Sequence, residues 1–163
     1  MKSSAIKPCL MAAAVGDSGA DLRSLRTWDL SPIARRVERE LGWSWKFVLR
    51  VEREYRHFIA LAVLEPADRL GMQGPVDEFW HRHILFTQDY HRFCHAVAGG
   101  YIHHSPHEAE THAGGGSYQR TLALLERRFG KVDEAVWPRI GANSCNNCAS
   151  CDKVGERDVL TRA

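Results

Sequence analysis

The stretch that decides the fold runs from Trp43 to Glu65 and reads WSWKFVLRVEREYRHFIALAVLE. Apolar residues recur every three or four positions in it, and charged residues fill the gaps in its first half. This spacing predicts one long helix, because residues three and four apart share a face of an α-helix. The helix is expected to be amphipathic at first and buried towards its end, where nearly all residues are apolar. Pro66 ends it.

Other helices are predicted on both sides of this segment from their start and stop residues. Ser31-Pro32 places a cap and a proline at a helix start, and Ser117 is a second cap residue. Gly and Pro residues mark the ends of the periodic segments. The predicted helices span residues 31–41, 43–65, 75–98 and 117–129, with one further turn at 132–137. No strand alternation or repeat is present, so the sequence predicts an all-α fold, an irregular bundle of four to five helices.

Length and composition predict one domain with poorly ordered ends. The chain has 163 residues, of which 44% are apolar, enough to bury a core. Residues 1–21 lack a sustained period and are predicted to form a disordered leader, because the apolar patch within them is short for a secretory signal. Residues 22–140 are predicted to form the helical domain, and residues 141–163 a cysteine-containing tail.

Charge and hydropathy exclude some classes of partner. The formal net charge is only +2, which does not favour a nucleic-acid-binding protein. No apolar run approaches the roughly 20 residues that span a bilayer. We therefore expect neither nucleic acid nor a membrane as a partner.

Three of the five cysteines are clustered as Cys145-Asn-Asn-Cys148-Ala-Ser-Cys151. Thiolates at this spacing can converge on a metal ion, although a closed site needs a fourth ligand. A redox pair with a resolving cysteine and a solvated tail without metal are the alternatives. Close spacing and an odd count are unlike a secreted disulfide framework, so a cytoplasmic location is predicted.

Most of the nine histidines are concentrated between Val76 and His107. Neutral imidazole is a common ligand of transition metals and a proton carrier near neutral pH. Asp77 and His81 are four residues apart, as are His91 and His95, which is the spacing at which two helical side chains can reach one ion. The cluster therefore predicts a metal site.

A ligand set can be proposed from these positions. His81 and His83 point about 160° apart on a regular helix, so one of them is expected to be structural. The glycines at 99–100 allow the next loop to fold back over the helix. The predicted set of metal ligands combines His81 or His83 with one or two histidines of that loop. Asp77 or Glu78 either binds the metal as well or orients one of the histidine ligands. The loop histidines are His103, His104 and His107.

Several positions are assigned to packing instead. His57, His91, His95 and His112 lie among polar residues on faces expected to meet solvent, and no function is assigned to them. Phe79, Trp80, Tyr90 and Phe93 recur at helical spacing and are expected in the core. Cys94, with aromatic neighbours in mid-helix, is expected to be a small core residue rather than a nucleophile.

Residues 77–85, in the form Asp-x-x-Trp-His-x-His-x-Leu, are followed by Thr87, Tyr90, Cys94 and His103-His104-x-Pro106. This pattern resembles the glycine-rich-domain-containing-protein-like family, in its short bacterial form, over residues 30–137. The resemblance implies a small helical domain. The positions that it singles out are Trp80, His81, His83, Tyr90, Cys94, His103 and His104.

Two functions are compatible with these patterns. The first is a small metalloenzyme for oxidative or hydrolytic tailoring of a peptide or small molecule, with zinc, iron or copper bound by histidines, and with Tyr90 and Asp77 in catalytic roles. The second is a non-catalytic metal-handling or protein-interaction module, with a structural zinc or copper site formed by the histidines and by Cys145, Cys148 and Cys151. The sequence does not decide whether the protein is an enzyme.

Overall fold

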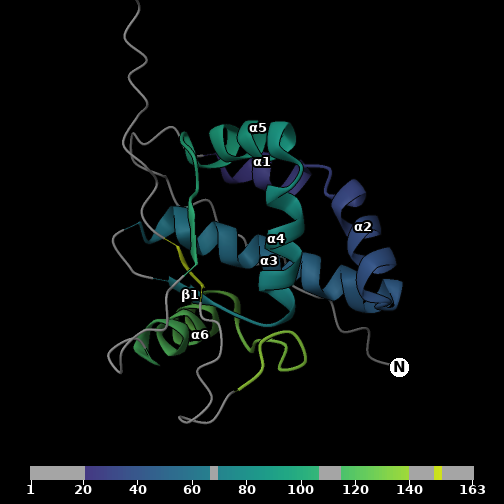
Figure 1. Cartoon of the computed structure of the whole chain (residues 1–163). Helices are drawn as coiled ribbons and strands as arrows, with labels where there is room; N and C mark the ends of the chain where they lie inside the picture. Colours follow the sequence, from purple (N-terminus) through teal and green to yellow (C-terminus); the bar gives the residue numbers. More distant parts are fainter. Residues whose placement is uncertain (1–20, 67–69, 107–114, 140–148, 152–163) are drawn as a thin grey trace, which may run out of the picture.

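The computed structural model describes residues 21–66, 70–106, 115–139 and 149–151 (Figure 1). The described part contains six helices, and the all-α fold class is confirmed. The leader predicted for 1–21 and the tail predicted for 141–163 lie almost wholly outside the described residues. The helices are α1 (Leu22–Thr27), α2 (Ser31–Leu41), α3 (Trp45–Leu64), α4 (Pro75–Ile84), α5 (Thr87–Ala98) and α6 (Gly115–Phe129). None of these helices is both long and apolar enough to cross a membrane.

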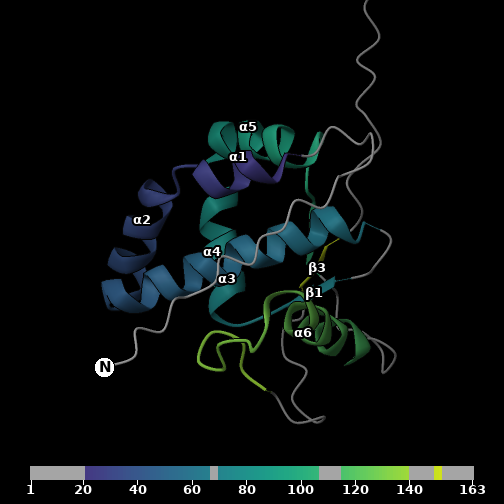
Figure 2. The ribbon, with the colours of Figure 1, turned by 180° about the vertical axis from the view of Figure 1, so that it is seen from behind.

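Helix α3, the long helix that the apolar pattern predicted, is the central element of the described fold. The Ser44 side chain caps it by accepting a hydrogen bond from the Phe47 amide at 3.3 Å. Helices α1, α2, α4 and α6 all contact it, and it crosses the middle of the molecule in the front and rear views (Figures 1 and 2). Its inner positions, among them Val51, Tyr55 and Phe58, are fully buried. The core therefore forms around this helix.

The single helix predicted for 75–98 is wrong, because the chain leaves the helical conformation between Leu85 and Thr87. Phe86 has ψ of 60°, and its amide donates to the His83 carbonyl, so α4 ends there and α5 begins. The reversal lets Tyr90 and Phe93 of α5 pack against His83 of α4, with ring centroids 5.0 and 4.8 Å apart. Tertiary packing thus overrides a helical period that continues through the break.

The helix count and boundaries also differ from the prediction at the ends. The described residues form six helices instead of the predicted four to five, because α4 and α5 replace one predicted helix and Asp21 caps the additional short helix α1 by accepting from the Arg23 amide. Helix α6 begins two residues before the predicted cap Ser117. At 133–137, the backbone amides of Val136 and Trp137 donate hydrogen bonds to the Asp133 carbonyl and form the one predicted turn.

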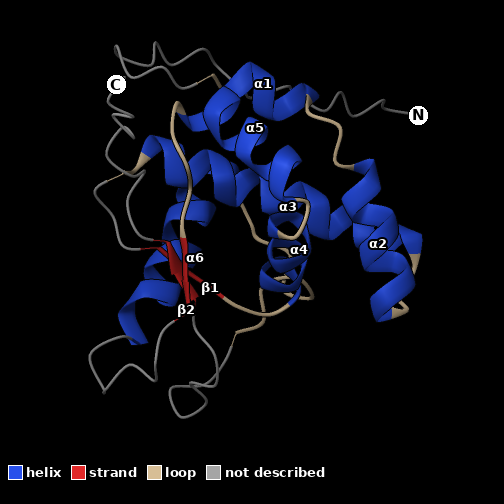
Figure 3. Cartoon of the chain, turned by 45° about the horizontal axis from the view of Figure 1, so that its top comes forward, coloured by secondary structure: helices blue, strands red, loops and turns tan. Residues whose placement is uncertain are grey.

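Three short strands form a small sheet that the sequence did not predict: β1 (Leu70–Met72), β2 (His104–Pro106) and β3 (Ala149–Cys151). The strand order is β1-β3-β2, with both pairs antiparallel. Three-residue strands are too short for an alternating pattern. The sheet lies beside α6 (Figure 3), and an added Cβ on Gly71 would lie 2.6 Å from the Tyr118 amide nitrogen. Glycine at this position therefore permits the close approach of α6 to β1.

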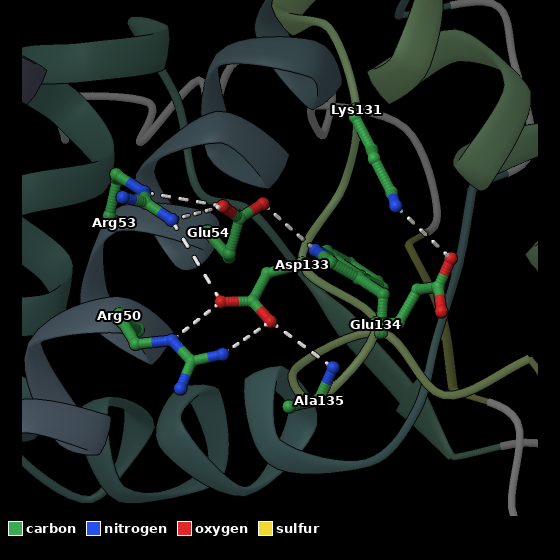
Figure 4. A network of polar contacts seen from close by, with 8 residues as sticks. Arg50, Arg53, Glu54, Lys131, Asp133, Glu134 and Ala135 are labelled. Carbon is green, nitrogen blue, oxygen red and sulfur yellow. Dashed lines mark hydrogen bonds and ion pairs between the residues drawn. The ribbon is translucent and has the colours of Figure 1, made fainter.

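A polar network attaches the turn after α6 to α3 (Figure 4). Arg50 donates two hydrogen bonds of 2.6 Å to Asp133, and Trp137 Nε1 donates to buried Glu54 at 3.1 Å. Burial raises the pKa of Glu54, but hydrogen bonds from His57 and Trp137 outweigh it and hold that pKa below its ordinary value. The carboxylate is therefore charged and depends on its donors.

Replacing Trp137 with Phe keeps most of the buried ring and removes one donor to this carboxylate. We expect the free energy of unfolding to fall by about 1–3 kcal/mol, because a buried charged acceptor loses a partner. Urea denaturation measures it. Trp45→Phe, at a half-buried ring beneath Arg35, is the matched control and should change stability less. An equal loss in both variants would show that ring size, not the hydrogen bond, matters.

Candidate metal centre

Helix α4 positions two of the candidate ligands. Gly74, at φ 74° and ψ −148°, turns the chain into the helix, and Pro75 is its first residue. Asp77 then lies in the first turn, and His81 follows four residues later. Because four residues make little more than one turn, both side chains lie on one face of α4.

His104 reaches the same place from strand β2. Its side chain is only 8% exposed, and its ring lies 4.5 Å from the Trp80 ring and 4.6 Å from the His81 ring, centroid to centroid. Two aromatic neighbours on α4 therefore hold this imidazole beside the helix.

The three side chains form a group that could hold a metal ion. The Nε2 atoms of His104 and His81 lie 3.4 and 3.7 Å from Asp77 Oδ1, and the ligand atoms of all three residues lie within 4.8 Å of one another. Ligands about 2.05 Å from a tetrahedral ion are about 3.3 Å apart. The two distances to Asp77 are thus close to the spacing that a bound ion requires. His104 Nε2 also forms a hydrogen bond with Asp77 Oδ1 at 3.4 Å, whereas the 3.7 Å between His81 and Asp77 is too long for one.

His83, the other histidine of the Trp-His-x-His stretch, lies on a different face of α4 and is fully buried. Its Nδ1 is 2.9 Å from the Tyr55 hydroxyl and its Nε2 is 3.3 Å from Asp89 Oδ2, which also accepts a hydrogen bond from Trp28 Nε1. Burial lowers the pKa of His83 to about 4, although the carboxylate of Asp89 opposes this shift. His83 is therefore neutral near pH 7 and links α4 to α3 and α5.

Tyr90 and Cys94 are buried in the core below the site, and so are Phe79, Trp80 and Phe93, as the sequence predicted. The Tyr90 hydroxyl donates to the Ile102 carbonyl at 2.6 Å and accepts from Trp80 Nε1 at 2.9 Å. Burial raises the pKa of Tyr90 far above its ordinary value and that of Cys94 to about 11. Both groups therefore stay protonated at neutral pH.

Two of the remaining candidate ligands, His103 and Glu78, are described by the structure and are not part of this group. His103 is exposed, with its ring 4.7 Å from that of Tyr101. Glu78 forms an ion pair with Arg82. His107, Cys145 and Cys148 lie outside the described residues, and Cys151 lies in β3, where its backbone pairs in register with both His104 and Leu70.

Sequence reasoning missed the partners of His83, because nothing in the spacing connects Tyr55 or Asp89 with it. It also missed that strand β3 pairs with β2, the strand that carries His104. The i, i+4 spacing of Asp77 and His81 was the informative signal.

Fold and site define a small helical protein with a candidate metal site of two histidines and one carboxylate. The sequence profile of the UCP032817-like family matches residues 26–123, more than half of the chain, so the chain belongs to this family. No curated protein and no solved structure matches the sequence.

The resemblance to the glycine-rich-domain-containing-protein-like family is therefore wrong. The pattern that suggested it consists largely of core residues, since Trp80, His83, Tyr90 and Cys94 are all fully buried. Buried aromatic and imidazole residues at helical spacing follow from packing and are not specific to one family.

The burial of His83 predicts how stability depends on pH. The unfolded chain takes up a proton at this position below pH 6.5, whereas the folded protein resists protonation down to about pH 4. Acidification from pH 6.5 to 4 should thus reduce the free energy of unfolding by up to about 3 kcal/mol through this residue. Urea denaturation in EDTA at several pH values measures it.

The variant His83→Gln is the control for this measurement, because it lacks the imidazole that titrates. It should be less stable at pH 7, because it loses the bonds to Tyr55 and Asp89, but its stability should fall less on acidification. Parallel pH profiles for the two proteins would contradict the assignment of the titration to His83.

Proposed function

We propose that the protein binds one divalent transition-metal ion through Asp77, His81 and His104 and is a metalloenzyme. The observation that carries this proposal is the convergence of three donor atoms from α4 and β2 at ligand spacing. Neutral His104 can donate a hydrogen bond to Asp77, but an ion pair between His81 and Asp77 would require a protonated histidine, whereas a metal ion is bound by both imidazoles in their neutral form. A cation shared by all three side chains accounts for their arrangement.

The donor set restricts the metal. Two imidazoles and one carboxylate suit zinc, iron(II) and copper rather than magnesium or calcium, which prefer oxygen ligands. The same composition occurs in catalytic zinc sites and in non-haem iron oxygenases. Zinc would supply Lewis-acid activation of water, and iron or copper would supply redox chemistry.

Exposure supports a catalytic site rather than a closed structural one. The side chain of His81 is 44% exposed, whereas those of Asp77 and His104 are 11% and 8% exposed. The group is therefore accessible on the side of His81 and shielded on the side of β2. Three protein ligands leave at least one coordination position, which a water, a small molecule or a peptide group could take.

Neighbouring residues would orient the ligands. The Trp80 ring restricts the rotation of His104, and the Tyr90 hydroxyl fixes the Ile102 carbonyl two residues before it. We therefore assign Tyr90 a positioning role instead of proton transfer, because its hydroxyl is buried and already bonded. Asp77 is assigned as a ligand that also neutralises part of the ion's charge.

The alternative function is a metal-handling module that uses the same ligands without catalysis. Both functions require the site, so metal binding is tested first. Turnover then separates them, because only an enzyme would convert a peptide or small molecule in a way that depends on the bound ion.

The decisive variants are Asp77→Asn, His81→Ala and His104→Ala, with His103→Ala as the matched control next to His104 but outside the group. Competition titrations with zinc and iron(II) should show one equivalent bound by the wild type and by the control. Each ligand variant should lose at least tenfold in affinity, because one of three protein ligands is removed. Equal affinity in all five proteins would refute the proposed site.

Strand β3 is expected to contribute to this affinity through its backbone. A chain ending at residue 140 lacks the strand that pairs with β2, so His104 loses the backbone pairing that helps to hold it, and we expect metal affinity to fall about tenfold. The full-length Cys151→Ser variant keeps the backbone pairing and should bind like the wild type. Weak binding by Cys151→Ser would instead show that the thiol contributes directly.

A further inference from the structure

A second pair of histidines lies on helix α5, away from the group formed with Asp77. His91 and His95 are both exposed, and their ring centroids are 4.5 Å apart with 49° between the ring planes. Their separation by four residues places them on one face of the helix, one turn apart. The His91 ring also lies 6.3 Å from that of Tyr101 in the segment after α5.

Packing does not require these two imidazoles. The opposite side of α5 supplies the core residues Tyr90, Phe93, Cys94 and Val97, all fully buried. Replacement of either imidazole by another polar side chain would leave that core unchanged. The solvent-facing surface of α5 thus carries two adjacent nitrogen donors that are accessible from outside.

We propose that His91 and His95 form a second metal site, selective for a divalent transition metal that prefers nitrogen ligands. Helical histidines at i and i+4 can each give one ring nitrogen to the same ion, and water fills the remaining positions. With two imidazoles and no carboxylate, the site favours copper(II), nickel(II) and zinc over magnesium and calcium. It shares no ligand with the group at Asp77.

The exposure of the pair defines the kind of site. Two protein ligands on a helix surface leave most coordination positions to water, so the ion exchanges readily with solvent. The pair resembles neither a closed structural centre nor a shielded catalytic one. We infer a weak, readily exchanging site on the outer face of α5.

The test is a zinc titration of the full-length protein followed by ¹H–¹⁵N spectra of the histidine rings. Signals of His91 and His95 should shift together with one midpoint, and the same shift should occur in Asp77→Asn. This variant separates the two sites, because its substitution affects only the other one. Independent midpoints for the two rings, or no shift even at zinc concentrations far above those that saturate the wild-type Asp77 group, would overturn the proposal.

A swap of neighbouring residues provides the matched control. The variant Arg92→His/His95→Arg keeps the composition but places the two histidines side by side in the chain, about 100° apart around the helix. Arg92 is 71% exposed, and the swap removes its 3.7 Å ion pair with Asp89 but replaces no buried side chain. The midpoint for the His91 ring should rise at least tenfold. An unchanged midpoint would show that each imidazole binds zinc singly and would contradict a shared site.

Discussion

The structure depends on the way α4 is fixed against α3. Tyr55 of α3 contacts the Phe79 ring at 5.1 Å and bonds to His83 at 2.9 Å, and Phe58 packs 5.8 Å from Trp80. These contacts bury one side of α4 and so fix its rotation. Because residues advance by about 100°, Asp77 and His81 must then lie on a different side from Phe79 and His83. The core thereby directs both candidate ligands towards β2.

The candidate site also depends on chain segments that are distant in sequence. His104 enters through β2, whose register is set by β3 near the end of the chain. The Tyr90 bond to the Ile102 carbonyl and the Trp80 ring restrict the same segment from below. A site with one ligand on such a segment can be shaped by residues that never touch the ion.

Local patterns in the sequence predicted much of the fold. Helical periodicity identified α2, α3 and α6 and the buried aromatic residues of α4 and α5, because amphipathicity is a local property. The predicted caps Ser31 and Ser117 are wrong, since both residues lie inside their helices. The break at Phe86 was missed, since the helical period continues through it and only packing of α5 on His83 requires a turn. The strands were missed because their pairing is non-local.

Local patterns also predicted part of the candidate site. The spacing of Asp77 and His81 indicated one helix face, and the argument that His81 and His83 cannot share an ion agrees with their separate environments. Sequence could not choose among His103, His104 and His107, because that choice depends on where β2 lies. It also gave no indication that His83 would bond to Tyr55 and Asp89.

X-ray absorption spectroscopy of the full-length protein loaded with one equivalent of zinc tests the central claim most directly. The account predicts nitrogen and oxygen ligands at about 2.0–2.2 Å, with imidazole scattering reduced in His104→Ala, which keeps only His81. A shell of sulfur at about 2.3 Å would place the ion on the cysteines of the tail and contradict the site at Asp77, His81 and His104.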